Sequence, residues 1–381
     1  MSKYAITYTI LTVILTMSAL TGRSQDGVLQ FILTSDVHYG ITRPHFRGAD
    51  SVSAVVVNEA MIAVFNQLPK MVIPNDNGVG SGKMINHIDA LAITGDIANR
   101  QEVGIQSAAT SWQQFEADYT HKLTTKGLDH QPTSLWLCAG NHDVTDAIGY
   151  LKPTEPVTDA SSMAGIYNRM MSPAHARTAA DYNYTTDKIH YSRDIGGIHI
   201  QFVNLWPDSA EQVWMEQDLK GLKANTPVLL FTHSMPELEA RFFTNPNGQH
   251  TINNTDKFEN LLPETFKSGK SIKDTALYEE KGLAAFLKHH PEIKAYFHGH
   301  NNWNEFYDWQ SPDKDFSIPC FRVDSPMKGR KSAKDETQLS FQLISIDTRT
   351  KTMTVRECRW NTVPGNPSIF EWGDHKTMSL N

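Results

Sequence analysis

The amino-acid sequence predicts an α/β fold, in which short buried strands alternate with helices. Five short apolar runs have the length and composition of buried strands: residues 29–34, 90–94, 135–139, 228–232 and 294–297. Apolar residues at helical spacing lie between these runs. Such alternation is typical of a sheet whose strands are joined by helical crossovers.

The remaining elements follow from the same patterns. Segment 51–68 is predicted to be helical because its apolar residues, among them Val56, Ala60 and Val64, recur near helical spacing. Further helices are predicted over residues 108–123, 211–223 and 277–289, and two further strands over 191–195 and 199–205.

The C-terminal third changes character. Strands are predicted over residues 316–323, 338–347 and 352–358, with a hairpin turn at 347–351. We interpret them as an antiparallel addition that completes the main sheet, so residues 26–381 form one predicted domain. Polar inserts at 144–188 and 236–276 interrupt it, and loops of that length are often functional.

Composition excludes several classes of protein. The chain has 381 residues, 40% of them hydrophobic, which is enough to form a packed core rather than a disordered chain. Its net charge of −7 gives no general electrostatic reason to bind nucleic acid. Three cysteines exclude a disulfide scaffold. Cys138 is expected to be buried and inert; Cys320 and Cys358 either pair after export or, as we favour, remain buried thiols.

Residues 1–25 are predicted to be a cleaved signal peptide. Lys3 precedes an uncharged run over residues 5–20, which is followed by small residues and is short for a spanning helix. Cleavage is expected between residues 19 and 26, with an uncleaved anchor as the alternative. The mature protein is therefore expected to be exported, either periplasmic or secreted, with no membrane span.

Each of the five apolar runs ends in a potential metal ligand. The endings are Asp36-Val37-His38, Gly95-Asp96, Gly140-Asn141-His142-Asp143, His233 and His298-Gly299-His300. In α/β sheets, ligands bind outside the carboxyl ends of the strands, so these side chains are expected to converge. Oxygen and imidazole donors without a thiolate suit Mn, Fe, Zn, Ni or Co in a catalytic site.

In this order the motifs D-x-H, G-D-x-x-N, G-N-H-D, H and G-H resemble those of the calcineurin-like metallophosphoesterases. The resemblance covers roughly residues 28–310. It implies an α/β/β/α fold of two stacked mixed β-sheets flanked by helices. It also implies two divalent or mixed-valence metal ions, such as Mn, Fe or Zn, and a phosphoester substrate.

The resemblance further implies a role for each matching residue. Asp36 and His38 resemble ligands of the first metal, and Asp96 resembles the bridging carboxylate. Ligands of the second metal are matched by Asn141, His233 and His300. His142 resembles the residue that binds the phosphoryl group or protonates the leaving group, and the implied nucleophile is a metal-bound hydroxide. His142 and Asp96 are thus the predicted catalytic residues.

Two positions depart from the family pattern. Where the family usually has a second histidine in G-H-x-H, this chain has Asn302. Asn302 is a candidate ligand of the first metal, with a water-holding role or no role as the alternatives. Asn99 stands where purple acid phosphatases have a tyrosine ligand, which argues against that branch.

The sequence motifs leave alternatives for the substrate class and for several nearby residues. The motifs do not choose between a phosphomonoesterase and a diesterase acting on nucleotides or phospholipid headgroups. A metal-binding surface protein without turnover is the alternative from another class. Asp143 is expected to orient or cap, and Arg43, Arg47 and Arg100 are further candidates for phosphate contact.

Overall fold

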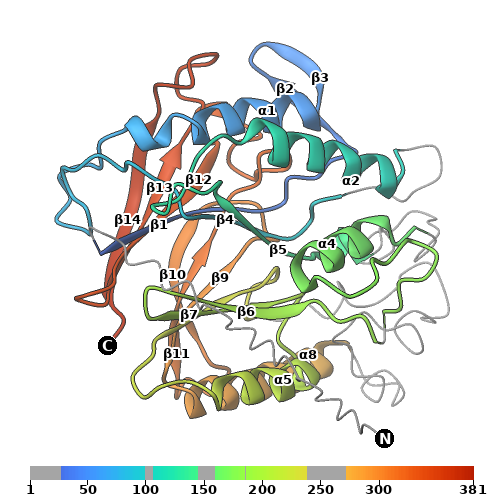
Figure 1. The fold of residues 1–381 in the computed structure, drawn as a ribbon, viewed down its shortest axis with the longest axis vertical. Coiled ribbons are helices and arrows are strands. Elements are labelled where there is room, and N and C mark those ends of the chain that lie inside the picture. Colours follow the sequence, from blue (N-terminus) through green and yellow to red (C-terminus); the bar gives the residue numbers. More distant parts are fainter. Residues whose placement is uncertain (1–26, 99–105, 145–158, 185, 238–271) are drawn as a thin grey trace, which may run out of the picture.

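Two six-stranded sheets stack with helices on both outer faces (Figure 1). The structure is a computed structural model that describes residues 27–98, 106–144, 159–184, 186–237 and 272–381. The predicted fold class, two stacked mixed sheets flanked by helices, is therefore confirmed.

The first sheet has the strand order β14-β13-β12-β1-β4-β5. Its strands are β1 (Val28–Thr34), β4 (Ala90–Thr94), β5 (Ser134–Cys138), β12 (Ser340–Asp347), β13 (Thr352–Arg359) and β14 (Glu371–Ser379). Strands β1, β4 and β5 are parallel to one another. On the other side of β1, β12 pairs antiparallel with β1, β13 with β12, and β14 with β13. The carboxyl ends of β1, β4 and β5 therefore lie at the same end of this sheet.

The second sheet has the strand order β10-β11-β9-β8-β7-β6. Its strands are β6 (His190–Ile195), β7 (Ile198–Val203), β8 (Val228–Phe231), β9 (Ile293–His298), β10 (Glu305–Gln310) and β11 (Ser317–Arg322). β7, β8, β9 and β11 are parallel to their neighbours, and β6 and β10 form antiparallel edges. The carboxyl ends of β8, β9 and β11 therefore lie at the same end of this second sheet.

The helices form the outer layers (Figure 1). Helices α1 (Ala54–Phe65) and α2 (Ala108–Ala117) cover the first sheet, and α5 (Ser209–Leu219) and α8 (Ile272–His289) cover the second. Helix α4 (Ser161–Met171) packs against β5 and β6, and α3 (Asn141–Val144) is a single turn. The hairpin β2 (Thr42–Phe46) and β3 (Ala49–Ser53) precedes α1. Ser107 Oγ caps α2 by accepting from the Thr110 amide at 3.2 Å.

Aromatic rings fill the space between the two sheets. Trp136 of β5 contacts Phe31 of β1 at 5.2 Å between centroids and Phe202 of β7 at 5.6 Å. The series continues from Phe202 to Phe231 at 5.1 Å and from Phe231 to Phe297 at 4.5 Å. Because these rings are buried, their contacts stabilise the packing of the two sheets and so the relative position of their strand ends.

Four features differ from the predictions. Residues 49–53 form β3, so α1 begins at Ala54 rather than at residue 51. Helix α4 lies within the insert predicted at 144–188, and strands β2, β10 and β14 were not predicted. The C-terminal addition is not wholly antiparallel, because β11 pairs with β9 in parallel.

The three cysteines are buried free thiols, as the favoured alternative predicted. The signal peptide, Asn99, Arg100 and most of the 236–276 insert lie outside the described residues. No helix in the described ranges is long and apolar enough to cross a membrane.

Candidate metal centre

The carboxyl ends of strands from both sheets meet at one buried cluster of polar side chains. Asp36 and His38 follow β1, Asp96 follows β4, and Asn141 begins the turn after β5. From the second sheet, His233 follows β8 and His300 follows β9. All six side chains are buried, so the sheet stacking brings the predicted ligands together.

The first half of the cluster contains Asp36, His38 and Asp96. Each offers a ligand atom within 4.8 Å of the others. His38 Nε2 lies 3.6 Å from Asp36 Oδ1 and 3.8 Å from Asp96 Oδ2. These three atoms thus surround a common point.

The second half contains Asp96, His233 and His300, whose ligand atoms also lie within 4.8 Å of one another. His233 Nε2 is 3.4 Å from Asp96 Oδ1, 3.0 Å from Asn141 Oδ1 and 3.0 Å from His300 Nδ1. Its Nδ1 lies 2.7 Å from the Thr94 carbonyl, which orients the ring. Asp96 therefore belongs to both groups of candidate ligands.

The backbone turns sharply at the predicted ligands. Asp36, His38, Asp96, His300 and Asn302 have left-handed φ values of 54°, 45°, 52°, 68° and 60°. Such conformations are costly for most residues and cluster at functional sites. They persist here because the loops bind one another: the Asp36 amide donates to the Gly95 carbonyl and the His38 amide to the Asp96 carbonyl, each at 2.9 Å.

Glycine is required at three motif positions because atoms of neighbouring loops lie very close to the backbone there. A Cβ on Gly140 would lie 2.2 Å from Asp96 Oδ1, and one on Gly299 would lie 2.4 Å from Asp36 Oδ2. Gly95 has φ +101°, and a Cβ there would lie 2.7 Å from His233 Nδ1. The glycines therefore let backbone and ligand side chains share the same small volume.

The protonation states of the side chains in the cluster favour the binding of metal cations. Burial lowers the pKa of His38, His233 and His300, which keeps these imidazoles in the neutral form that coordinates metals. Burial and the nearby Asp36 carboxylate raise the pKa of Asp96 well above its usual value. A cation between the two carboxylates would relieve that repulsion.

Unpaired oxygens also fit a metal centre. Within the described residues, Asp36 Oδ1 and Asn302 Oδ1 are buried without a hydrogen-bond partner. Asn302 Nδ2 donates to the His300 carbonyl at 2.9 Å, which fixes the amide and leaves the lone pairs of its buried oxygen available to a ligand. A buried oxygen without a donor is costly, and a metal ion is one partner that removes the cost. The residues present thus fit the binding of metal ions.

His142 stands beside the first half of the cluster. Its ring makes an edge contact with His38 at 5.4 Å between centroids, and its amide donates to Asp96 Oδ1 at 2.9 Å. Asp143, which was expected to orient, accepts from the amides of Ile97, Ala98 and Gly140 at 2.8–3.1 Å. It thereby ties the loops after β4 and β5 together.

Sequence reasoning missed Lys328, whose Nζ lies 3.4 Å from His142 Nε2. Lys328 follows β11, which pairs with β9 in parallel. The strand-end rule that identified the other residues would have found it, had β11 been recognised as a parallel strand.

Other candidates lie away from the cluster. Arg43 is buried and donates to the carbonyls of His45, Pro326 and Ser332, and Arg47 donates to Asn361. The guanidinium groups of both arginines therefore bind groups of this chain. His298 lies against the Tyr307 hydroxyl at 2.9 Å.

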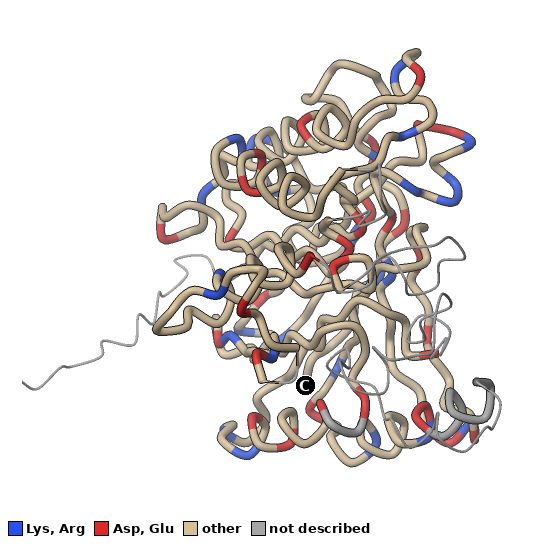
Figure 2. Tube along the Cα trace, turned by 90° about the vertical axis from the view of Figure 1, so that its right-hand side faces the viewer, with Lys and Arg blue, Asp and Glu red and all other residues tan. Residues whose placement is uncertain are grey.

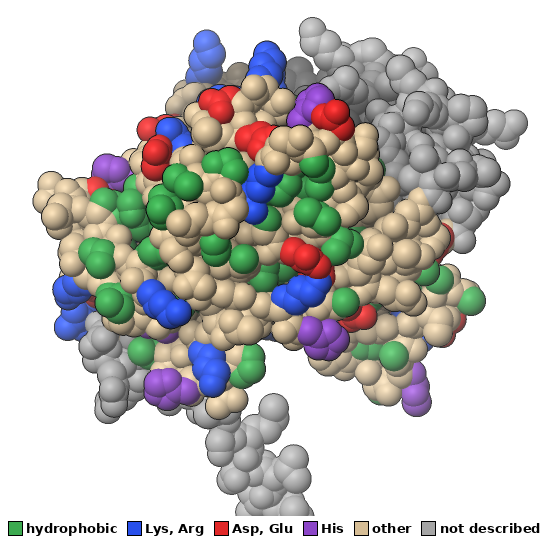
Figure 3. Space-filling view, turned by 90° about the horizontal axis from the view of Figure 1, so that it is seen from above, with side chains coloured by type: hydrophobic (Ala, Val, Ile, Leu, Met, Phe, Trp, Pro, Cys, Tyr) green, Lys and Arg blue, Asp and Glu red, His purple; other side chains and the backbone are tan. Residues whose placement is uncertain are grey.

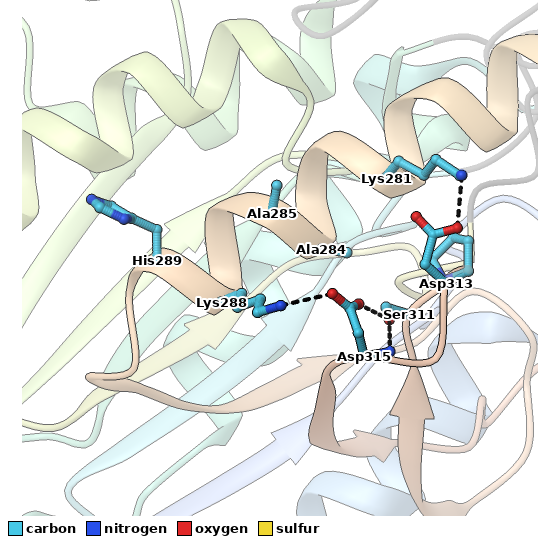
Figure 4. Close-up of a pocket in the computed structure, with 9 residues that line it drawn as sticks. Lys281, Ala284, Ala285, Lys288, His289, Ser311, Asp313 and Asp315 are labelled. Atoms are coloured by element: carbon cyan, nitrogen blue, oxygen red, sulfur yellow. Dashed lines mark hydrogen bonds and ion pairs between the residues drawn. The ribbon is translucent and has the colours of Figure 1, made fainter.

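A cavity of about 360 Å³ lies elsewhere, between α8 and the turn from β10 to β11 (Figure 4). Lys281 pairs with Asp313 and Lys288 with Asp315, each at 2.7 Å, across its mouth. In each pair, the aspartate neutralises the charge of the lysine. None of the predicted ligands lines this cavity.

Surface charge is mixed over the described chain. Lys and Arg are interspersed with Asp and Glu along the trace (Figure 2). The face above α1 and α2 likewise mixes basic, acidic, histidine and apolar side chains (Figure 3). The buried cluster is therefore the feature that points to chemistry.

Comparisons with known proteins identify the family of the chain. A family model described as calcineurin-like phosphoesterase matches residues 29–314. A solved structure described as PhoD covers 93% of this chain and 70% of that chain, with 9% identity and a TM-score of 0.52, which is a similarity of fold alone. A Vps29 single mutant from Entamoeba histolytica covers 92% of this chain and 100% of that chain, with 9% identity and a TM-score of 0.30. Among curated proteins, none matches the chain.

Proposed function

The chain belongs to the calcineurin-like phosphoesterase family, and from this premise we propose that it hydrolyses phosphoric esters at the buried cluster. Family membership supports a metal-dependent phosphoesterase in general. The proposal adds the assignment of roles to residues of this chain.

In the proposal, two metal ions occupy the two halves of the cluster. Asp36, His38 and Asn302 would hold the first ion, and Asn141, His233 and His300 would hold the second. Asp96 would contribute to both, as its place in both halves supports. When bound, such a pair activates water and neutralises the charge of the phosphoryl oxygens.

His142 acts on the substrate. It lies next to the cluster without belonging to either ligand group, and it is almost fully buried. Hydrolysis forms a bond from the water oxygen to phosphorus and breaks the bond to the leaving oxygen. We assign to His142 the proton that the leaving oxygen takes up, or the binding of a phosphoryl oxygen.

The observation that carries the proposal is the shared carboxylate of Asp96 between two sets of buried donors. The proposal also includes export: residues 1–25 have the charge and apolar pattern of a signal peptide. Recovery of the chain outside the cytoplasm, shortened by about 25 residues as the pattern predicts, would test that part.

The function is tested with the purified chain loaded with Mn²⁺. Para-nitrophenyl phosphate and bis(para-nitrophenyl) phosphate are offered in parallel. His142→Ala is expected to lower turnover, through loss of phosphoryl binding or of the proton for the leaving oxygen, while the exposed His121→Ala has no effect. Asp96→Asn is expected to abolish turnover. Stoichiometric metal without turnover of either ester would contradict the proposal and favour a metal-binding protein.

A further inference from the structure

The loop of residues 324–335, which we term the Lys328 loop, is attached to both sides of the metal centre. Ser325 Oγ donates to the Asp36 carbonyl at 2.8 Å. Farther along, the Arg330 amide donates to the Asn302 carbonyl at 2.5 Å. Lys328 lies between these two attachments, so its backbone is held by two loops that carry predicted ligands.

The base of the Lys328 loop is rigid. Ser325 Oγ also accepts from the amides of Met327 and Lys328 at 3.1 and 2.9 Å, forming a closed turn. Beneath it, the buried Arg43 guanidinium donates to the Pro326 carbonyl at 2.8 Å and the Ser332 carbonyl at 2.5 Å. These contacts hold the backbone carbonyls on both sides of Lys328, which fixes the point from which its side chain extends.

The ammonium group of Lys328 lies beside His142. Its Nζ is 3.4 Å from His142 Nε2, and the His142 ring in turn contacts His38. Lys328 is itself outside both ligand groups, so it can act on a bound group without being a ligand of the metal.

We propose that Lys328 binds a non-bridging phosphoryl oxygen beside His142 and makes this centre select phosphomonoesters over phosphodiesters. The inference rests on the proposed function and names its substrate class. A monoester is close to a dianion at neutral pH and has three non-bridging oxygens. A diester is a monoanion and has two, because its second ester group replaces the third. A fixed ammonium group adds a charge-assisted hydrogen bond to that third oxygen.

The matched variants come from the same loop. Lys328→Met removes the charge and keeps the length of the side chain, and Lys328→Arg retains the charge. Lys331→Met is the control, since Lys331 is exposed and belongs to the same loop. Thermal melting and Mn²⁺ titration first establish that all variants fold and bind metal as the unmodified chain does.

Two readouts are then compared. Calorimetric titration of the Mn²⁺-loaded chain with inorganic phosphate is expected to show binding about ten- to a hundredfold weaker in Lys328→Met, and largely kept in Lys328→Arg. The ratio of kcat/KM for para-nitrophenyl phosphate to that for bis(para-nitrophenyl) phosphate is expected to fall by a similar factor. Lys331→Met should change neither readout.

The outcomes separate the two proposals. Unchanged phosphate binding in Lys328→Met, or an equal loss for both esters, overturns the inference about Lys328. If the unmodified chain hydrolyses neither ester, the proposed function fails, and the phosphate titration alone then decides whether Lys328 binds the phosphoryl group.

Discussion

Asn302 provides a test that separates metal binding from folding. Its amide oxygen is buried without a hydrogen-bond partner in the described structure, and its Nδ2 donates to the His300 carbonyl at 2.9 Å. Its φ of 60° lies in the left-handed region. If the oxygen is present to bind a metal, replacing Asn302 by alanine should change metal affinity far more than stability.

The expected change in stability follows from three opposing contributions. Removing a buried oxygen without a partner is favourable by about 1–3 kcal/mol. Loss of the Nδ2 hydrogen bond costs about 0.5–1.5 kcal/mol. Alanine in the left-handed region costs about 1–2 kcal/mol. These contributions nearly cancel, so the metal-free free energy of unfolding of Asn302→Ala should lie within about 1 kcal/mol of the unmodified value.

Metal affinity should respond differently. Loss of one ligand is expected to weaken Mn²⁺ binding about tenfold or more, which removes about 1.4 kcal/mol of stabilisation at a fixed excess of metal. Calorimetric titration gives the affinity, and denaturant unfolding with and without Mn²⁺ gives the stabilities. Asn225→Ala is the control: Asn225 also has a left-handed φ, 63°, but is exposed between α5 and β8.

The reasoning would be refuted by the reverse pattern. Unchanged Mn²⁺ affinity together with a loss of several kcal/mol in the metal-free chain would make Asn302 a structural turn residue. Asn225→Ala should lose only the conformational contribution and bind Mn²⁺ as before.

Three further predictions use the same assays. Asn302→His, which supplies the usual imidazole, is expected to tighten the first metal; equal affinity in calorimetry would falsify it. Gly299→Ala places a Cβ 2.4 Å from Asp36 Oδ2 and should weaken metal binding while the far-ultraviolet circular dichroism is kept; full Mn²⁺ affinity would contradict this. Burial, against the opposing charge of Arg43, raises the pKa of Asp324 from 3.8 to about 8. The folded state therefore keeps a proton that the unfolded chain releases, so this contribution to stability is complete below about pH 4 and falls until about pH 8. Asp324→Asn should remove that decline in denaturant unfolding, and an unaltered pH profile would count against the buried acid.

The ligand positions could be predicted because they depend on local sequence. Each apolar run is a strand, and a polar residue directly after a strand is placed at its carboxyl end whatever the rest of the chain does. The motif order then related Asp36, Asp96 and His233 to one another without any geometry. Glycines beside them were recognisable for the same reason, since close backbone approach restricts the residue type.

The missed residues depend on strand direction. The C-terminal strands were interpreted as an antiparallel addition, which would carry their carboxyl ends away from the site. β11 instead pairs with β9 in parallel, through Cys320 opposite Tyr296 and Arg322 opposite His298. That pairing places Lys328 beside His142. Likewise Arg43 was considered as a phosphate contact, yet it is buried beneath the Lys328 loop.

The sequence by itself determined the α/β class, the five buried strands that begin from apolar runs and the donors that follow them, because periodicity and residue chemistry act over a few neighbouring residues. Tertiary structure alone decided which strand ends meet. Stacking of the two sheets through Trp136 and Phe202 brings Asp96 to His233, and parallel pairing of β11 brings Lys328 to the same place. Contacts between residues so far apart in the chain depend on packing of whole sheets, which no local pattern records.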